Sequence, residues 1–249
     1  MKLFDVYPLY EVTPVKAKDV YVYDEKGTEY LDLYGGHAVI SIGHSHPHYV
    51  RRLSEQLEQI AFYSNAIQNP MQQELAEGIA THSCLHDYRL FLCSTGAEAI
   101  ENALKLASFH TGKKRVIAFN NAFHGRTSAA VAVTDNAAIN APLNQQHQVT
   151  FIDFNDSAAL KKELQKEDVC AVIFESIQGV GGLDEPQAEF VQTMETLCNQ
   201  HQACLIADEV QSGFGRSGMF FAFQQYNIRP HVITMAKGMG NGFPIGGIL

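Results

Sequence analysis

Short apolar runs and amphipathic stretches alternate along the chain from about residue 70 onward. The amphipathic stretches repeat apolar residues with the spacing of one helix face and predict helices over 71–83, 96–110, 157–165 and 188–201. The apolar runs predict strands over 89–93, 115–119, 149–153, 170–175, 203–208 and 231–235. Nearly continuous apolar strands separated by helices are typical of a mostly parallel sheet with helices on both faces. The pattern therefore predicts an α/β fold.

The first sixty residues follow a different pattern. Two alternating runs, 20–23 and 29–33, flank a turn that ends at Gly27, and together they predict a β-hairpin in a small α+β segment. We therefore divide the chain into residues 1–60 and a larger part over 61–249. The chain stops inside the apolar run over 245–249, so we expect a C-terminal part beyond it.

Composition narrows the function classes. Hydrophobic residues make up 46% of the chain and charged residues 18%, which is ordinary for a globular protein with a large core. The net charge of −9 argues against a general nucleic-acid or membrane-surface binder. The five cysteines form no CxxC pair, and no run is long enough to span a membrane. We expect a cytoplasmic protein with reduced cysteines.

Residues after the strands are the candidates for chemistry, because ligands of such sheets bind at the carboxyl ends of the strands. A helix begins at Gly96, where its unpaired N–H groups can bind an anion, unless Thr95 simply caps it. Asp208 ends a strand and could pair with a cationic ring nitrogen or cap a helix. Lys237 precedes a glycine-rich stretch, where a lysine can form a Schiff base with a carbonyl cofactor or be solvated.

Pyridoxal 5'-phosphate requires three features together: an anion site, a partner for its protonated ring nitrogen and an amine that forms a Schiff base. In the segments that carry them, the chain resembles the class III (ornithine-type) aminotransferases of fold type I, and most closely their acetylornithine-using members. The matching segments are Gly43-His44-Ser45-His46-Pro47, Ser94-Thr95-Gly96-Ala97-Glu98-Ala99, Phe123-His124-Gly125-Arg126-Thr127, Asp208-Glu209-Val210-Gln211-Ser212-Gly213-Phe214-Gly215-Arg216-Ser217-Gly218 and Lys237-Gly238. The resemblance implies that residues 1–60 are the N-terminal part of a small domain and that 61–249 form a large cofactor-binding domain.

The resemblance also implies a role for each matching residue. Lys237 would bind the cofactor covalently and later move a proton at the substrate's α-carbon. Asp208 would keep the pyridine nitrogen protonated. Arg126 would bind the distal carboxylate of the substrate through its bidentate fork. The other implied cofactor contacts are Thr95, Gly96 and Ala97 at the phosphate, Phe123 on the ring face, Gln211 at the phenolic oxygen, and Glu175. No metal is implied.

The activity implied is transfer of the δ-amino group of N-acetylornithine to 2-oxoglutarate, a step of arginine biosynthesis, by a homodimer. In the ornithine-using relatives, an aromatic side chain lies near the segment that corresponds to residues 34–37. Here Gly35 and Gly36 remove that bulk, which favours an acylated donor. N-succinylornithine or another omega-amine, such as ornithine or 4-aminobutyrate, is the alternative donor.

Two departures from the family pattern concern substrate selection. The family usually reads Glu-Pro-(Ile/Val)-Gln-Gly-Glu, whereas residues 175–180 are Glu-Ser-Ile-Gln-Gly-Val, so Val180 replaces a glutamate often found near the substrate carboxylate. The family also continues into a C-terminal small domain that carries a second carboxylate-binding arginine. Neither feature is present in these 249 residues.

Three competing interpretations have weaker support. Residues 213–218 match GxGxxG but lie beyond the strand end without an obvious following helix, which disfavours a dinucleotide site. His44, His46 and His48 could suggest a metal hydrolase, yet Pro47 and the residues after it predict a helix with proline in its first turn. A non-catalytic protein with this fold would not need Lys237, Asp208 and Arg126 together.

Overall fold

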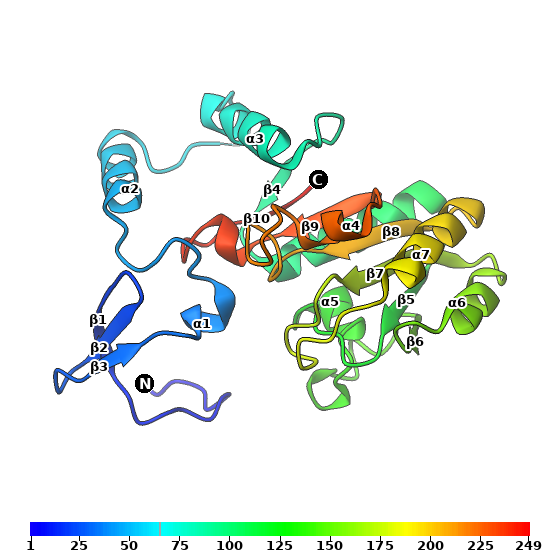
Figure 1. Cartoon of the computed structure of the whole chain (residues 1–249), viewed down its shortest axis with the longest axis horizontal. Helices are drawn as coiled ribbons and strands as arrows, with labels where there is room; N and C mark the ends of the chain where they lie inside the picture. Colours follow the sequence, from blue (N-terminus) through cyan, green and yellow to red (C-terminus); the bar gives the residue numbers. More distant parts are fainter. Residues whose placement is uncertain (65) are drawn as a thin grey trace. The chain divides into compact units, whose positions relative to one another are not determined.

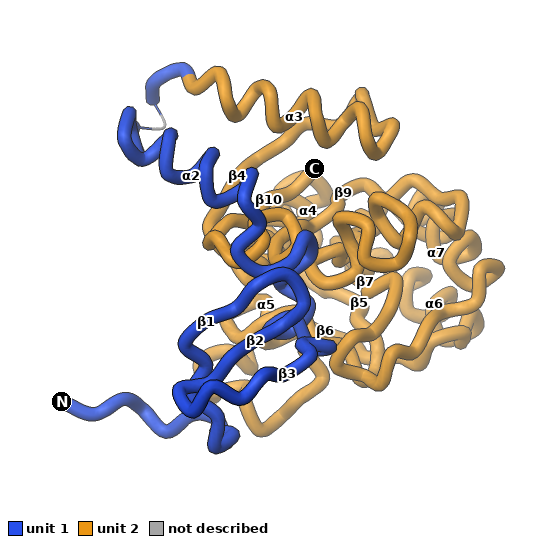
Figure 2. The backbone as a smooth tube through the Cα atoms, turned by 60° about the vertical axis from the view of Figure 1, so that its left-hand side comes forward, with its two compact units in different colours: residues 1–68 blue, residues 69–249 orange. Residues whose placement is uncertain are grey.

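The computed structural model describes residues 1–64 and 66–249. The chain divides into two compact units, Met1–Gln68 and Asn69–Leu249, which Figure 2 colours blue and orange. This division falls inside the stretch 61–249 that the sequence assigns to one large domain. The assignment of the two parts to a small domain and a cofactor-binding domain stays a prediction.

Unit 1 contains the predicted hairpin. Strands β2 and β3 pair antiparallel, with Tyr23 opposite Glu29. The turn between them forms because Asp24 Oδ1 accepts the N–H groups of Lys26 and Thr28 at 2.9 and 2.8 Å. A further strand, β1, pairs with β2 and was not predicted. The elements of this unit are β1 (Pro14–Lys18), β2 (Tyr21–Asp24), β3 (Glu29–Leu31), α1 (Gly35–Ala38) and α2 (Pro47–Gln59).

Unit 2 contains the predicted alternation of helices and strands. Each predicted element is present, with ends that differ by no more than two residues from those expected. The elements are α3 (Pro70–Ser83), β4 (Phe91–Cys93), α4 (Gly96–Thr111), β5 (Arg115–Phe119), α5 (Ser128–Ala132), η1 (Ala137–Ile139), β6 (Val149–Ile152), α6 (Ser157–Leu164), β7 (Val169–Glu175), α7 (Ala188–Gln200), β8 (Cys204–Asp208), η2 (Ala222–Tyr226), β9 (Val232–Met235), η3 (Lys237–Met239) and β10 (Gly246–Ile248).

The strands of unit 2 form one sheet in the order β4-β10-β9-β8-β7-β5-β6 (Figure 1). Strand β10 is antiparallel to both of its neighbours, β4 and β9, and the remaining pairs are parallel. The prediction of a mostly parallel sheet is confirmed. Because all strands except β10 run in one direction, their carboxyl ends lie at a common edge.

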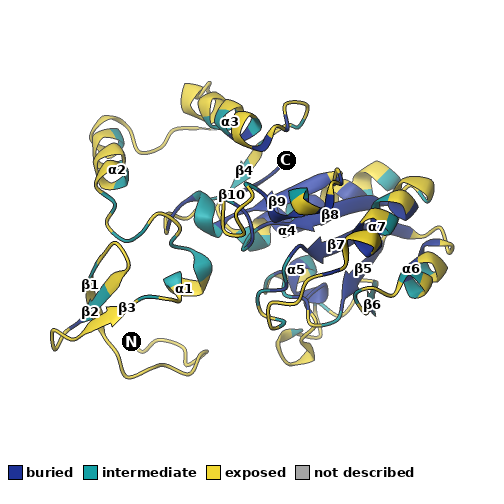
Figure 3. Cartoon of the chain, viewed as in Figure 1, coloured by how far each residue is buried: buried dark blue, intermediate teal, exposed yellow. Residues whose placement is uncertain are grey.

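Helices cover both faces of this sheet. On one face, Leu160 of α6 and Met194 of α7 belong to a buried cluster with Phe119 and Phe174 of the strands. On the other face, α4 and α5 pack on the alternate strand residues. Helix α4 lies close to the sheet because its buried stripe includes small residues, namely Ala99, Ala103 and Ala107. Figure 3 shows the central strands β7, β8 and β9 buried and the outer helix surfaces exposed.

None of the helices in the described part of the chain is both long enough and apolar enough to cross a membrane.

Candidate active site

Most of the predicted site residues lie just after strands at the carboxyl edge of the unit 2 sheet. Glu175 and Asp208 are the last residues of the neighbouring strands β7 and β8, and they stand opposite each other in the register. Lys237 lies two residues beyond β9, on the other side of β8. Thr95 follows β4, and Phe123 lies in the loop after β5. The fold therefore brings residues from five strands to one edge.

Asp208 is the best-connected of these side chains. Its Oδ2 lies 2.6 Å from Nδ1 of His124, while its Oδ1 accepts hydrogen bonds from Thr234 Oγ1 at 3.1 Å and from the Val210 N–H at 3.0 Å. Both Asp208 and His124 are buried. These partners hold the carboxylate in one orientation.

His124 is a buried partner of Asp208 to which the sequence assigns no role. Burial lowers the pKa of His124, but the hydrogen bond to Asp208 and the charges of Asp208 and Glu175 outweigh burial and raise it. Its backbone N–H donates to Thr134 Oγ1 at 2.9 Å, which anchors the loop. The available signal was its position inside a matching family segment, next to Phe123.

Glu175 accepts hydrogen bonds from two backbone N–H groups. The Phe123 N–H donates to Oε1 at 2.9 Å and the Gly179 N–H to Oε2 at 3.3 Å. Burial is the largest cause that raises the pKa of Glu175, to about 7; the charge of Asp208 raises it further and that of His124 opposes the rise. Glu175 thus links the loop after β5 to the loop after β7.

Lys237 has the properties of a reactive amine. Burial lowers the pKa of its ammonium group, and the charges of Asp208 and Glu175 only partly oppose this effect. A lowered pKa raises the fraction of neutral amine, which is the nucleophilic form. Its φ of 47° lies in the left-handed region, which is uncommon for a residue other than glycine.

Glycine contacts show how closely the predicted segments meet. A Cβ built on Gly96 would lie 2.8 Å from Cγ1 of Val210 and 3.4 Å from Cβ of Ala236. The start of α4 therefore touches the residues beside Asp208 and Lys237. A Cβ built on Gly125 would lie 3.1 Å from Cβ of Ala97, and one built on Gly179 would overlap the side chain of Gln211. A larger residue at Gly96 would require Val210 to move, so glycine favours this approach.

The start of α4 supports both sequence interpretations. Thr95 Oγ1 accepts the Glu98 N–H at 3.1 Å, and Glu98 Oε2 in turn accepts the Ser94 N–H at 2.8 Å, so Thr95 does cap the helix. Gly96 and Ala97 are the first residues of α4, and their N–H groups have no acceptor within the helix. These N–H groups and the helix dipole can bind a phosphate.

The predicted substrate-binding residue, Arg126, lies in the loop after β5, and Val180 lies in the loop after β7. The Arg126 guanidinium lies 5.8 Å from the centre of the Phe123 ring, in the range of a cation–π contact. Val180 is 66% exposed, whereas Ser176 is fully buried and its Oγ donates to Glu209. The GxGxxG segment forms turns before the short helix η2.

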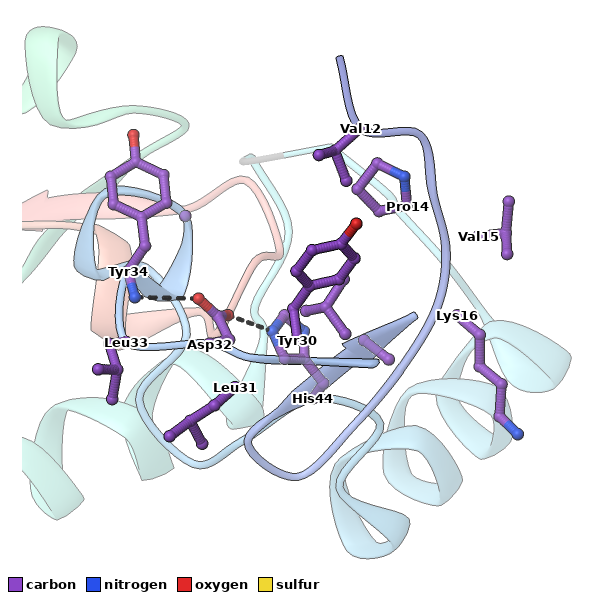
Figure 4. Close-up of a pocket in the computed structure, with 13 residues that line it drawn as sticks. Val12, Pro14, Val15, Lys16, Tyr30, Leu31, Asp32, Leu33, Tyr34 and His44 are labelled. Carbon is purple, nitrogen blue, oxygen red and sulfur yellow. Dashed lines mark hydrogen bonds and ion pairs between the residues drawn. The ribbon is translucent and has the colours of Figure 1, made fainter. Parts of the chain in front are cut away.

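In unit 1, the segment that contains Gly35 and Gly36 forms a left-handed turn. The φ angles of Gly35, Gly36, His37 and Ala38 lie between 57° and 63°. Asp32 holds the start of this turn, because its Oδ1 accepts the Tyr34 and Gly35 N–H groups at 3.0 and 2.8 Å. Its Oδ2 pairs with His44 Nε2 at 2.7 Å, beside a cavity of about 860 Å³ on unit 1 (Figure 4).

The remaining histidines of the competing metal interpretation lie at the start of α2. Helix α2 begins at Pro47, as predicted. In residues 1–64 and 66–249, no three His, Cys, Asp or Glu side chains are grouped so as to hold a metal ion.

The residues at the sheet edge fit pyridoxal 5'-phosphate. They offer an amine of lowered pKa, a buried carboxylate for a ring nitrogen and a helix N-terminus for a phosphate. The close approach at Gly96 leaves the first N–H groups of α4 beside the segments that carry Asp208 and Lys237.

The raised pKa of Glu175 predicts a pH-dependent stability. Because the pKa of about 7 in the folded state exceeds the ordinary glutamate pKa of 4.5, the stabilising contribution of Glu175 is fully present below pH 4.5 and is lost as the pH rises through 7. We expect the free energy of unfolding to fall by at most about 3 kcal/mol over this window. Glu175→Gln should flatten the fall, as measured by urea unfolding at pH 5 and pH 8 without cofactor. The exposed Glu185→Gln variant is the control, and an equal fall in both variants would contradict the assignment.

Comparisons with known proteins give a consistent result. The family model described as aminotransferase class-III matches residues 6–249. The acetylornithine aminotransferase of Bacillus subtilis (strain 168) is 39% identical over 99% of this chain, and that of Archaeoglobus fulgidus is 42% identical over 98%. The chain spans 64% of the length of each of these relatives.

Solved structures are also similar. The chain aligns with the ornithine aminotransferase of Toxoplasma gondii ME49 at a TM-score of 0.92 and 28% identity, covering 99% of this chain and 60% of that one. It aligns with the N-acetylornithine aminotransferase of Stenotrophomonas maltophilia K279a at a TM-score of 0.83 and 35% identity, covering 98% and 62%. The predicted fold class is confirmed by these neighbours.

Proposed function

Because the chain belongs to the class-III aminotransferase family, we propose that it transfers the δ-amino group of N-acetylornithine to 2-oxoglutarate with pyridoxal 5'-phosphate as cofactor. The observation that carries the proposal is the meeting of Lys237, Asp208 and the start of α4 at one edge of the sheet. The names of the sequence relatives support the acetylated donor. The similarity to an ornithine aminotransferase supports free ornithine as the alternative, beside N-succinylornithine and 4-aminobutyrate.

We assign the cofactor contacts to residues of the sheet edge. Lys237 would hold pyridoxal phosphate through its amine, and the N–H groups of Gly96 and Ala97, with Thr95, would hold the phosphate. Phe123, Gln211 and Glu175 complete the assigned contacts. When bound, the cofactor supplies an electron sink for the negative charge that develops on the substrate carbon.

The chain's own residues supply the remaining chemistry. Asp208 is oriented by Thr234 and His124, so it can keep a facing ring nitrogen protonated. The lowered pKa of Lys237 suits its Nζ to accept a proton from the substrate carbon and return it. Arg126 can bind a substrate carboxylate through two parallel hydrogen bonds.

Arg126→Lys tests the substrate-binding assignment. A lysine keeps the positive charge but loses the bidentate fork, so we expect kcat/KM for donors with a distal carboxylate to fall about tenfold or more. The exposed Lys162→Arg variant controls for a cation exchange elsewhere. If kcat/KM for these donors is unchanged in Arg126→Lys, the assignment of Arg126 as the substrate-binding residue is wrong.

A comparison of donors tests the proposed function. The full-length protein loaded with pyridoxal phosphate would be mixed separately with N-acetylornithine, N-succinylornithine, ornithine and 4-aminobutyrate, without 2-oxoglutarate. We expect N-acetylornithine to change the visible absorption of the bound cofactor fastest. If another amine changes the absorption faster, that amine is the donor instead of N-acetylornithine. If no amine changes the absorption, the proposed aminotransferase function is refuted.

We further propose that the protein acts as a cytoplasmic homodimer on small molecules. The family resemblance supports the dimer. All five cysteines are free in the structure, which is compatible with a reducing compartment.

A further inference from the structure

A second carboxylate, Glu209, lies next to Asp208 in sequence and is fully buried, with 0% of its surface exposed. It accepts four hydrogen bonds. Ser176 Oγ and the Phe223 N–H donate to Oε1 at 2.6 and 2.9 Å, and Ser212 Oγ and the Ala222 N–H donate to Oε2 at 3.0 and 2.8 Å. None of the interpretations of the cofactor site uses this group.

The four donors match what an ionised carboxylate can accept. A carboxylate has about four acceptor positions, and each of these partners is an uncharged O–H or N–H donor. Burial raises the pKa of Glu209 above its ordinary value, and all four hydrogen bonds oppose this rise without cancelling it. A neutral amide in place of the carboxylate would point its own N–H groups at two of these donors. Buried donors that face each other without an acceptor are unfavourable.

The donors come from segments that carry the site. Ser176 directly follows Glu175, Glu209 directly follows Asp208, and Ser212 directly follows Gln211. Asp208 points to His124 and Thr234, whereas Glu209 points away from them, toward Ser176 and the start of η2. One buried group thus joins the ends of β7 and β8 to the turn after β8.

We propose that Glu209 is a positioning residue that fixes Glu175, Asp208 and Gln211 relative to one another for cofactor binding. Ser176, directly after β7, is its partner from that side of the sheet edge. The inference rests on the proposed function, because it concerns the same cofactor site.

The test compares hydroxyl removal at two buried serines. Ser176→Ala removes a donor to Glu209. Ser83→Ala removes a buried hydroxyl that donates only within α3, to the Ile79 carbonyl at 2.7 Å, and is the matched control. We expect Ser176→Ala to weaken equilibrium binding of pyridoxal phosphate to the cofactor-free protein about tenfold, since a hydrogen bond to a charged group is lost. Ser83→Ala should lower thermal stability to a similar extent without changing this affinity.

Three further measurements separate positioning from stability. Ser176→Ala, Ser212→Ala and Glu209→Gln should each shift the visible absorption of the bound cofactor and its dependence on pH, and Ser83→Ala should not. Amide exchange at Ala222 and Phe223 in the cofactor-free protein should accelerate in Glu209→Gln. If Glu209→Gln does not fold, the two serine variants decide the question.

The outcomes are distinguishable. Ser176→Ala and Ser212→Ala could lower stability while keeping the wild-type affinity for pyridoxal phosphate and an unchanged spectrum. Glu209 would then have a structural role only, which would overturn this inference but not the proposed function. Failure of the wild-type protein to bind pyridoxal phosphate would refute the proposed function as well.

Discussion

Replacing Lys237 with alanine is expected to lower kcat by about a thousandfold or more, because the variant would lose both the proposed covalent attachment of the cofactor and the proposed base for the substrate proton. The N–H groups at the start of α4 and the Asp208 carboxylate do not depend on the lysine side chain. Pyridoxal phosphate should therefore still bind, but without a covalent bond to the chain. Turnover would be measured with N-acetylornithine, and attachment by borohydride reduction followed by mass spectrometry.

The control for this variant is Lys162→Ala. Lys162 is exposed on α6, so its removal should leave both turnover and borohydride labelling unchanged. Addition of a small primary amine should partly restore activity in Lys237→Ala, since the missing group is an amine base. Near-normal turnover in Lys237→Ala, or labelling that persists there, would show that another residue performs this role.

The positions of Lys237 and Asp208 at strand ends could be predicted from the sequence. A parallel strand buried on both faces is recognisable as a continuous apolar run, and the first polar residue after it lies at the carboxyl edge. The start of α4 was equally recognisable, from small residues and a Thr cap after a strand. These features are local, and each is determined by a few neighbouring residues.

The contacts between these positions could not be predicted in the same way. His124 and Asp208 are 84 residues apart, and Ser176 and Glu209 are 33 apart, so their pairing depends on the lateral order of strands. That order comes from the packing of helices on the sheet, which no local pattern encodes. His124 therefore had no assigned role, and Glu209 was only part of a matching segment.

Strand β10 illustrates a different limit. Two of its three residues, Gly246 and Gly247, have weak strand propensity, and the sequence pattern does not predict a strand here. The glycines are required by close approach, because a Cβ built on Gly246 would lie 2.6 Å from the carbonyl oxygen of Thr95. Because β10 pairs with both β4 and β9, it connects the strand that precedes Thr95 to the strand that precedes Lys237. Here tertiary contacts, rather than propensity, determine the strand.

Asp208→Asn should lower kcat by about a hundredfold to ten-thousandfold, which is the second largest effect expected. The amide keeps the shape of the side chain and can still accept the Thr234 and Val210 hydrogen bonds, but it carries no charge to keep a ring nitrogen protonated. The pKa of His124 should also fall, because the hydrogen bond and the charge that raise it are weakened. The protein should fold and bind pyridoxal phosphate, so kcat rather than KM should carry the loss.

Asp153→Asn is a matched control for this variant, because Asp153 also follows a strand at this edge, β6, but pairs with Asn120 at 2.5 Å. Its turnover should stay within about twofold of the wild type, since surface substitutions of this kind have small effects. A pyridoxal phosphate analogue methylated at the ring nitrogen is permanently cationic and does not need the carboxylate. It should therefore reduce the difference in kcat between Asp208→Asn and the wild type. If the analogue leaves the difference unchanged, Asp208 acts through the position of His124 rather than through the charge of the ring nitrogen.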